Sequence, residues 1–264
     1  MSASMTPIIV ITGAANGIGR ATNELLKANG VSTIPCDREP CADTDYRLLD
    51  LMSPTSITQC ADTIPDNIEG LINCAGVAPV SHANTAVLKI NWFGTKLFTE
   101  KILTKIKPSG SVTTVASRAG DNWEDNIANL NQVIDRSYDE VTKTIDIENF
   151  TPARAYELSK ELLIFWSMIN AASHASIRFN TVSPSSVETR LTPSFKEAFK
   201  GRSVNNDNLR KQATTTNEIA EAIWFLANPL NLSINGVDLK VDQGITAKRK
   251  ITKINKTKQG TQDE

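Results

Sequence analysis

The sequence predicts an α/β fold in which helices cover both faces of a doubly wound parallel sheet of about seven strands. One observation is that short apolar runs alternate along the chain with amphipathic helical patterns. A second is that the first run, residues 7–12, is continuously apolar and rich in β-branched side chains, as in a strand buried on both faces. A third is that a glycine-rich turn joins this run to a helical pattern. We therefore expect three layers, α/β/α.

The length of the chain fits a single domain of this class. With 264 residues it can bury a sizeable core. We predict one domain over residues 1–247, with an insertion at 121–150 and a basic, flexible tail at 248–264.

The composition excludes several classes of function. The net charge of −1 gives no field that favours nucleic acid or a membrane surface. The N-terminus lacks a basic segment followed by a long apolar run, so we predict no signal peptide. The four cysteines have no C-x-x-C spacing and only two histidines are present, which argues against a zinc site or a disulfide framework. We predict no metal and a cytoplasmic location.

The remaining elements follow from the same patterns. Strands are expected at 7–12, 31–36, 46–51, 70–76, 111–116, 176–182 and 237–241. Helices are expected at 20–29, 54–61, 85–106, 155–167 and 216–227, with a mobile helical lid at 192–201.

The turn after the first strand carries Gly13, Gly17 and Gly19. Glycines let a backbone turn tightly and approach a diphosphate, and a helix N-terminus supplies free N–H groups and a positive dipole end. An ordinary turn with a helix cap is the alternative. The position between a strand and a helix favours a dinucleotide-binding loop of the Rossmann type.

The second predicted strand is followed by Asp37 and Arg38, and Asp37 lies 18 residues after Gly19. A carboxylate at this strand end hydrogen-bonds the adenosine ribose and repels a 2′-phosphate. Arg38 could instead hold such a phosphate. We therefore favour NAD and keep NADP as the alternative.

The helix expected at 155–167 carries Tyr156 and Lys160 one turn apart on the same face. An ammonium close to a phenol lowers a pKa that starts near ~10, so the tyrosine becomes usable in proton transfer. A surface Tyr and Lys on an amphipathic helix is the alternative. Asn91, inside another predicted helix, and Ser117, at the end of the fifth strand, are further candidate site residues.

Two segments stand apart from the alternating pattern. Residues 121–150 are polar, acid-rich and weakly periodic, which indicates a functional insertion or one partly ordered by binding. The tail is basic and is expected to be a solvated, frayed end, with binding to phosphates or acidic lipid as the alternative.

Taken in order, the motifs resemble the short-chain dehydrogenase/reductase family in its form of about 250 residues. Within it, Asn91-Trp-Phe-Gly, the long insertion and the residues after Lys160 are similar to the bacterial 3α-hydroxysteroid dehydrogenase/carbonyl reductase and coniferyl alcohol dehydrogenase group. The residues that carry the family resemblance are Thr12, Gly13, Gly17, Ile18, Gly19, Asp37, Asp50, Leu51, Asn73, Ala75, Gly76, Asn91, Ser117, Tyr156, Lys160, Ser183, Pro184 and Thr189.

The resemblance implies a role for each catalytic residue. Tyr156 would be the general acid in ketone reduction and the base in alcohol oxidation, while Lys160 holds the nicotinamide ribose. Ser117 would hydrogen-bond the substrate oxygen, and Asn91 would open its helix to hold a water that links Lys160 to solvent. The implied NAD site comprises Gly13, Asn16, Gly17, Ile18, Gly19, Asp37, Arg38, Asp50, Leu51, Asn73, Ala75, Gly76, Tyr156, Lys160, Pro184, Val187 and Thr189.

Two positions depart from the family pattern, because Ser185 and Gln243 stand where glycine is usual. The expected substrate is a small hydrophobic alcohol or ketone, either steroid-like or aryl-allylic, and a non-catalytic nucleotide sensor is the alternative. The family also implies a homodimer or homotetramer, with Phe165, Trp166 and Met168 supplying apolar surface for the interface. Candidates for the pocket wall are Trp123, Leu191, Phe195 and Phe199, within segments that reach residue 205.

Overall fold

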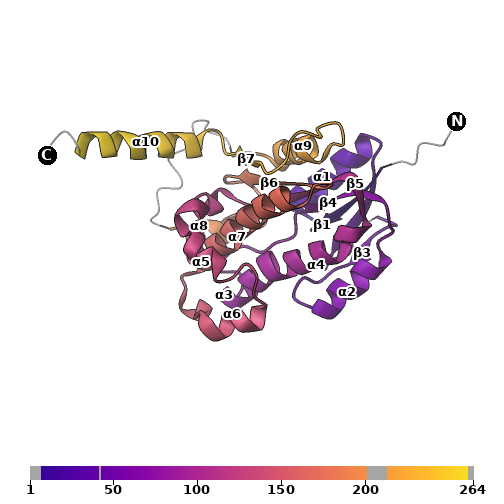
Figure 1. The fold of residues 1–264 in the computed structure, drawn as a ribbon, viewed down its shortest axis with the longest axis horizontal. Coiled ribbons are helices and arrows are strands. Elements are labelled where there is room, and N and C mark those ends of the chain that lie inside the picture. Colours follow the sequence, from indigo (N-terminus) through magenta and orange to yellow (C-terminus); the bar gives the residue numbers. More distant parts are fainter. Residues whose placement is uncertain (1–6, 42, 201–212, 261–264) are drawn as a thin grey trace.

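The computed structural model describes residues 7–41, 43–200 and 213–260, with side chains described as far as residue 255. It contains a seven-stranded parallel sheet in the order β3-β2-β1-β4-β5-β6-β7 (Figure 1). This confirms the predicted fold class. The strands are β1 Ile8–Thr12, β2 Ser32–Asp37, β3 Arg47–Leu48, β4 Ile68–Asn73, β5 Ile106–Val115, β6 Arg178–Pro184 and β7 Asp238–Val241.

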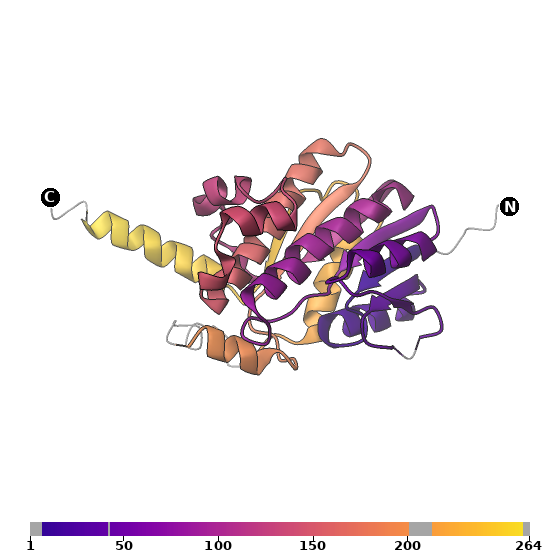
Figure 2. The ribbon, with the colours of Figure 1, turned by 90° about the horizontal axis from the view of Figure 1, so that it is seen from below.

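Helices cover both faces of the sheet and complete the three layers (Figures 1 and 2). On one face α1 (Gly17–Ala28) packs against α9 (Thr216–Ala227). On the other lie α2 (Pro54–Thr63), α4 (Thr95–Ile102) and α7 (Pro152–Ser173). Alternate residues of each strand feed the two cores: in β1, Ile9 and Ile11 join the cluster under α1 and α9, and Val10 joins the other. This explains why the strand reads as continuously apolar.

The helix expected at 85–106 is present but changes its winding. It comprises α3 (Asn84–Leu88), a π-helical segment η1 (Lys89–Gly94), α4 and a final turn η2 (Leu103–Lys105). Single π-helical turns inside an α-helix are rare and occur frequently at functional sites. Asn91 lies within the π-helical segment.

Two strand boundaries were predicted wrongly. Only Arg47 and Leu48 pair with β2, because the chain then turns away from the sheet edge, so the expected strand at 46–51 is short. The fifth strand starts at Ile106 instead of residue 111, and its register with β4 shifts where Ser109 takes a φ of 69°. An irregular strand of this kind carries turn residues, which is why the Pro-Ser-Gly sequence was interpreted as a turn.

The insertion at 121–150, expected to be functional or partly ordered by binding, is folded, and a functional role for it stays a prediction. It follows η3 (Arg118–Gly120) and comprises η4 (Trp123–Asn126), α5 (Ile127–Asn131), α6 (Tyr138–Thr144) and η5 (Ile147–Asn149). These elements are too short to show helical periodicity, but they bury a shared apolar cluster against α7. Its members from the insertion are Leu130, Val133, Ile134, Val141 and Ile147, and those from α7 are Leu158, Leu162, Leu163 and Trp166.

The same packing alters the predicted oligomer surface. Trp166 is 7% exposed and lies in the cluster under the insertion, so it offers no surface to a second subunit. Phe165 stacks on Trp123 at 5.6 Å between ring centroids. The interface role predicted for Trp166 is therefore wrong.

The basic tail is helical, which corrects the expectation of a frayed end. Helix α10 spans Ile245–Gly260 and projects from the body of the molecule (Figures 1 and 2). Its first turns are attached to the segment after β5, since Arg249 contacts Asp121 and Asn122. Residues 261–264 of the predicted tail lie outside the described residues.

Helix α8 (Thr192–Ala198) lies where the mobile lid was predicted, and its action as a lid stays a prediction. Gly201 and the pocket wall expected at 201–205 lie outside the described residues. Within the part of the chain that the structure describes, no helix combines the length and the apolar character needed to cross a bilayer.

If the insertion belongs to the core, truncating one of its buried side chains will destabilise the whole domain. Leu130 is fully buried, so Leu130→Ala is expected to lower the free energy of unfolding by about 2–5 kcal/mol. Ile127 lies in the same short helix but is 39% exposed, and Ile127→Ala should cost about 0.5 kcal/mol or less. Urea unfolding of both variants tests this, and equal small losses would contradict the packing described above.

Candidate active site

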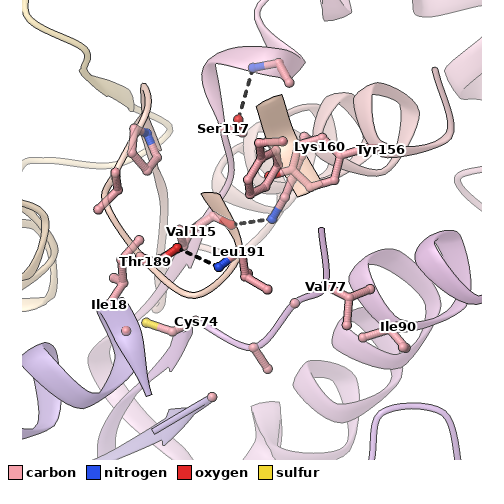
Figure 3. A pocket seen from close by; sticks show the side chains of 18 of the residues that line it. Ile18, Cys74, Val77, Ile90, Val115, Ser117, Tyr156, Lys160, Thr189 and Leu191 are labelled. Carbon is pink, nitrogen blue, oxygen red and sulfur yellow. Dashed lines mark hydrogen bonds between the residues drawn. The ribbon is translucent and has the colours of Figure 1, made fainter. Parts of the chain in front are cut away.

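A cavity of about 860 Å³ lies at the carboxyl edge of the sheet and extends from the ends of β1 and β2 to Tyr156 on α7. The strand order reverses between β1 and β4, and ligands of doubly wound sheets bind outside that switch point. Figure 3 shows side chains of α7, of the ends of β4 and β5 and of the loop after β6 facing this space.

The glycine turn at the end of β1 is held by close backbone contacts. A Cβ on Gly13 would lie 2.6 Å from the amide nitrogen of Ala75, and one on Gly19 would lie 2.2 Å from the carbonyl oxygen of Gly13. Gly13 and Gly17 also take φ values of 71° and 56°, in the left-handed region that favours glycine. These positions therefore require glycine, and the turn directs the N-terminus of α1 to the cavity.

The first turn of α1 fits a diphosphate. Asn16, the N-cap residue, makes no side-chain capping bond, and its Nδ2 donates to Oε2 of Glu39 at 3.0 Å. The first turn of α1 also contains no acidic residue. Uncapped N–H groups at the positive end of a helix dipole suit an anion. Gly13, Asn16, Gly17, Ile18 and Gly19 all line the cavity, as predicted.

At the end of β2, Asp37 is held by the backbone. Its carboxylate accepts hydrogen bonds from the amides of Ala15 (2.9 Å) and Glu39 (3.0 Å). Arg38 is exposed and lines the same end of the cavity. The sequence analysis missed Glu39, which also lines the cavity and pairs with Arg190 at 3.3 Å. Its position two residues after Asp37, next to the same strand end, could have indicated that Glu39 lines the cavity.

Most of the other predicted cofactor residues line the cavity, and one does not. Asp50, Leu51, Ala75 and Gly76 form part of the wall. Asn73 is 2% exposed, and its Nδ2 donates to Oγ1 of Thr99 (3.0 Å) and Oγ1 of Thr114 (3.3 Å). This side chain joins β4 to α4 and β5 and does not line the cavity, so a contact between Asn73 and the cofactor stays a prediction.

Tyr156, Lys160 and Ser117 meet at the other end of the cavity (Figure 3). Helix α7 begins at Pro152 after a capping bond from the amide of Arg154 to Oγ1 of Thr151, which fixes where Tyr156 and Lys160 face. The Nζ of Lys160 donates to the carbonyl oxygen of Val115 at 2.9 Å and lies 5.6 Å from the centroid of the Tyr156 ring.

Burial opposes the predicted effect of Lys160 on the phenol. Burial raises the pKa of Tyr156 to about 12, and only a hydrogen bond with Ser117 opposes it. Burial also lowers the pKa of Lys160 to about 8. Both shifts favour the neutral forms of the two groups, so a lowering of the phenol pKa by Lys160 stays a prediction. The sequence spacing indicated the two groups but not how deeply both are buried.

Asn91 lies behind the wall of the cavity. It is 1% exposed; its Oδ1 accepts from the amide of Val77 (2.8 Å), and its Nδ2 donates to the Val77 carbonyl (3.0 Å) and to Oγ of Ser159 (3.4 Å). A Cβ on Gly76 would lie 3.2 Å from Oδ1 of Asn91 and 3.9 Å from Nζ of Lys160. Asn91 thus fixes the loop after β4 beside Lys160, and its binding of a water stays a prediction.

The loop after β6 and helix α8 cover the remaining side. Pro184, Val187 and Thr189 line the cavity, as do the predicted apolar residues Leu191, Phe195 and Phe199. The ring of Phe195 meets that of Tyr156 edge-on at 5.1 Å. Trp123, in the insertion, stacks on Phe165 of α7 and does not line the cavity, so its predicted place in the pocket wall is wrong.

The two departures from the glycine pattern are accommodated. Ser185 lines the cavity, and its amide donates to the carbonyl of Val241 at 3.2 Å, so the loop keeps its backbone path beside β7. Gln243 takes a φ of 56° and donates from Nε2 to Oγ1 of Thr214 at 3.3 Å. A side chain at this left-handed position costs about 1 kcal/mol relative to glycine.

The comparisons with known proteins decide the family. A family model described as enoyl-(acyl carrier protein) reductase matches residues 13–246. A coniferyl-alcohol dehydrogenase from a Pseudomonas species is 30% identical over 248 residues, which cover 90% of this chain and 96% of that protein. This chain belongs to the short-chain dehydrogenase/reductase family.

Other relatives of this short-chain dehydrogenase/reductase agree. A 3α-hydroxysteroid dehydrogenase/carbonyl reductase from Comamonas testosteroni is 27% identical over 256 residues, covering 91% of this chain and 96% of the relative. The crystal structure of a 3α-hydroxysteroid dehydrogenase from Pseudomonas sp. B-0831 in complex with NADH superposes with a TM-score of 0.78 at 25% identity, over 91% of this chain and 97% of that one. The protein is an oxidoreductase of a family that uses a nicotinamide cofactor.

The burial of Lys160 predicts a specific pH dependence of stability. The pKa of Lys160 falls from 10.5 to about 8 on folding, so between these values the unfolded chain binds the extra proton. The free energy of unfolding should therefore rise with pH across this window, by up to about 3 kcal/mol relative to Lys160→Met. Tyr156 titrates in both proteins and cancels in the comparison. Urea unfolding from pH 8 to pH 10 tests this, and parallel curves for the two proteins would contradict it.

Proposed function

We propose that this protein is an NAD-dependent dehydrogenase that interconverts a hydrophobic secondary alcohol and its ketone. The observation that carries the proposal is the meeting of Ser117, Tyr156 and Lys160 at one end of a cavity whose other end suits a dinucleotide. Leu191, Phe195 and Phe199 line the cavity and favour an apolar substrate. The steroid-like substrate follows the hydroxysteroid dehydrogenases among its relatives.

In this proposal each polar group of the chain acts on one oxygen atom. When bound, the nicotinamide accepts or donates the hydride. The phenol of Tyr156 donates its proton to the carbonyl oxygen during reduction and removes it during oxidation. The hydroxyl of Ser117 hydrogen-bonds the same oxygen, where negative charge develops. A tyrosine whose pKa is raised to about 12 is well protonated at neutral pH, which suits the reductive direction.

Lys160 is held in place at the end of β5. Its bond to the Val115 carbonyl fixes the ammonium at the end of β5, next to Gly76 and the side chain of Asn91. Because its pKa is about 8, it can exchange a proton near neutral pH. We infer that Lys160 returns a proton to Tyr156 after reduction and that Asn91 keeps the neighbouring loop in place.

Two alternatives to these assignments remain open to test. The coniferyl-alcohol dehydrogenase similarity supports an aryl-allylic alcohol as the second candidate substrate.

The carboxylates of Asp37 and Glu39 support NAD over NADP, because both would face a 2′-phosphate. A homodimer or homotetramer, with the insertion occupying part of the helical face around α7, and a cytoplasmic location stay predictions.

Removing the phenolic hydroxyl tests the chemistry directly. Tyr156→Phe should lower kcat by about 10²–10⁴-fold, because the proton donor is lost while the ring still packs against Phe195. NADH affinity, measured by fluorescence, should change by about threefold or less. Turnover like that of the unaltered protein would remove Tyr156 from the mechanism.

The choice of cofactor rests on the end of β2. Asp37→Asn keeps an oxygen that can accept from the amide of Ala15 but removes the charge that faces a 2′-phosphate. The ratio of kcat/KM with NAD to that with NADP should fall by about tenfold or more. Asp66→Asn, an exposed site away from the cavity, is the charge-matched control. An unchanged ratio would show that Asp37 does not select the cofactor.

A further inference from the structure

The charged residues that line the cavity differ between its two ends. At the end formed by β2 and β3, acidic Asp37, Glu39 and Asp50 accompany Arg38 and Arg190. At the end formed by Tyr156 and Ser117, the lining contains Arg118, Lys196, Lys200 and Arg249 besides Lys160, against Glu157 as the acidic group. The substrate end is therefore rich in cations, although the whole chain has a net charge of −1.

Lys196 and Lys200 are the cations that carry the inference. They lie one turn apart, in α8 and just after it, so they share a side of this segment. Both are exposed, both line the cavity, and within residues 7–41, 43–200 and 213–255 neither makes an ion pair. Their charges are available to a ligand in the cavity.

Arg249 and Arg118 are held at the same end by other contacts. Arg118 follows Ser117 directly, and Arg249 reaches from α10 to within 3.3 Å of Oδ1 of Asn122 while it pairs with Asp121. Asp121 is shared with Lys240 at 2.9 Å, so its single carboxylate faces two cations. Lys240 also pairs with Asp238 at 2.6 Å, so Arg249 and Lys240 are balanced by two carboxylates, and the charge offered to a ligand comes from α8 and the residue after it.

In α8 and just after it, each aromatic residue of the cavity wall is followed directly by a lysine, while Glu197 between the two pairs does not line the cavity. Phe195 contacts Tyr156, and Phe199 lies one turn further along, next to Lys200. A ligand whose reacting carbon faces Tyr156 would place its apolar body against Phe195 and Phe199. Its far end would then lie near Lys196 and Lys200.

We propose that the substrate carries an anionic group, such as a carboxylate, on its apolar body, away from the carbon that is oxidised or reduced. Lys196 and Lys200 recognise this group. The inference rests on the proposed function, since it concerns the same cavity, but it adds a charge requirement that neutral steroids and aryl-allylic alcohols do not meet. The lysines select the substrate and take no part in proton transfer.

Matched acid and ester substrates test the charge requirement. We would use a steroid 3-ketone with a side-chain carboxylate, an aryl ketone with a ring carboxylate, and the methyl ester of each. For whichever of the two ketones is reduced faster, kcat/KM of the acid should exceed that of its methyl ester by about tenfold or more at low salt. Added KCl should reduce this difference. A ketone that carries a sulfate group in place of the carboxylate is compared with the methyl ester in the same way. The ratio of their kcat/KM values shows whether any anion or only a carboxylate is recognised.

Variants then assign the effect to the two lysines. In Lys196→Gln/Lys200→Gln the ratio of acid to ester should fall to about one through a higher KM for the acid, with kcat, ester kinetics and NADH affinity unchanged. The double variant Lys101→Gln/Lys143→Gln, whose exposed lysines lie away from the cavity, is the charge-matched control and should keep the ratio.

The outcomes separate this inference from the proposed function. Equal kcat/KM for acid and ester overturns the inference and leaves the dehydrogenase assignment intact. A change in NADH or NADPH affinity without a change in the ratio assigns the lysines to the cofactor and also overturns it. If neither ketone is reduced, the quenching of bound NADH fluorescence measures the affinities of acid and ester, and the ratio of these affinities decides the inference. Turnover of neutral alcohols then decides the proposed function.

Discussion

The site depends on the close approach of two backbone segments at the carboxyl ends of β1 and β4. Gly13 and Gly19 lie so near each other and Ala75 that a Cβ on either would overlap a backbone atom. This contact forces the chain to leave β1 in a tight turn and directs the N-terminus of α1 to the cavity. It also sets the start of the loop whose Gly76 lies beside Asn91 and Lys160. The dinucleotide end and the catalytic end of the cavity are therefore joined through one piece of rigid backbone.

Burial governs the chemistry that this backbone can support. Lys160 and Tyr156 are both almost fully buried. Burial raises the pKa of Tyr156 and lowers the pKa of Lys160, so it favours the neutral form of each group. In the proposed function, a protonated phenol and a lysine that titrates near pH 8 serve proton donation to a ketone. The insertion contributes to this burial indirectly, because its apolar cluster packs along α7 and holds the helix that carries both residues.

The sequence predicts the fold class and most cavity residues because both depend on local patterns. The strand, glycine turn and helix around Gly13, and the one-turn spacing of Tyr156 and Lys160, are visible in the chain itself. The features that the sequence did not predict depend on tertiary contacts. Asn73 follows a matching motif, yet its amide pairs with Thr99 and Thr114 inside the sheet–helix layer. The insertion buries apolar residues from elements too short to show a period, and the direction of the Tyr156 pKa shift depends on its depth.

The measurement that tests the account most directly is the absorbance of reduced nicotinamide when the intact protein is mixed with NAD and hydrophobic secondary alcohols. The panel would include hydroxysteroids and aryl-allylic alcohols, with and without a distal carboxylate. The account predicts accumulation of NADH with at least one secondary alcohol, at a rate that rises with protein concentration. Tight binding of NADH without any turnover across the panel would contradict it, and would favour a nucleotide-binding role for the same cavity.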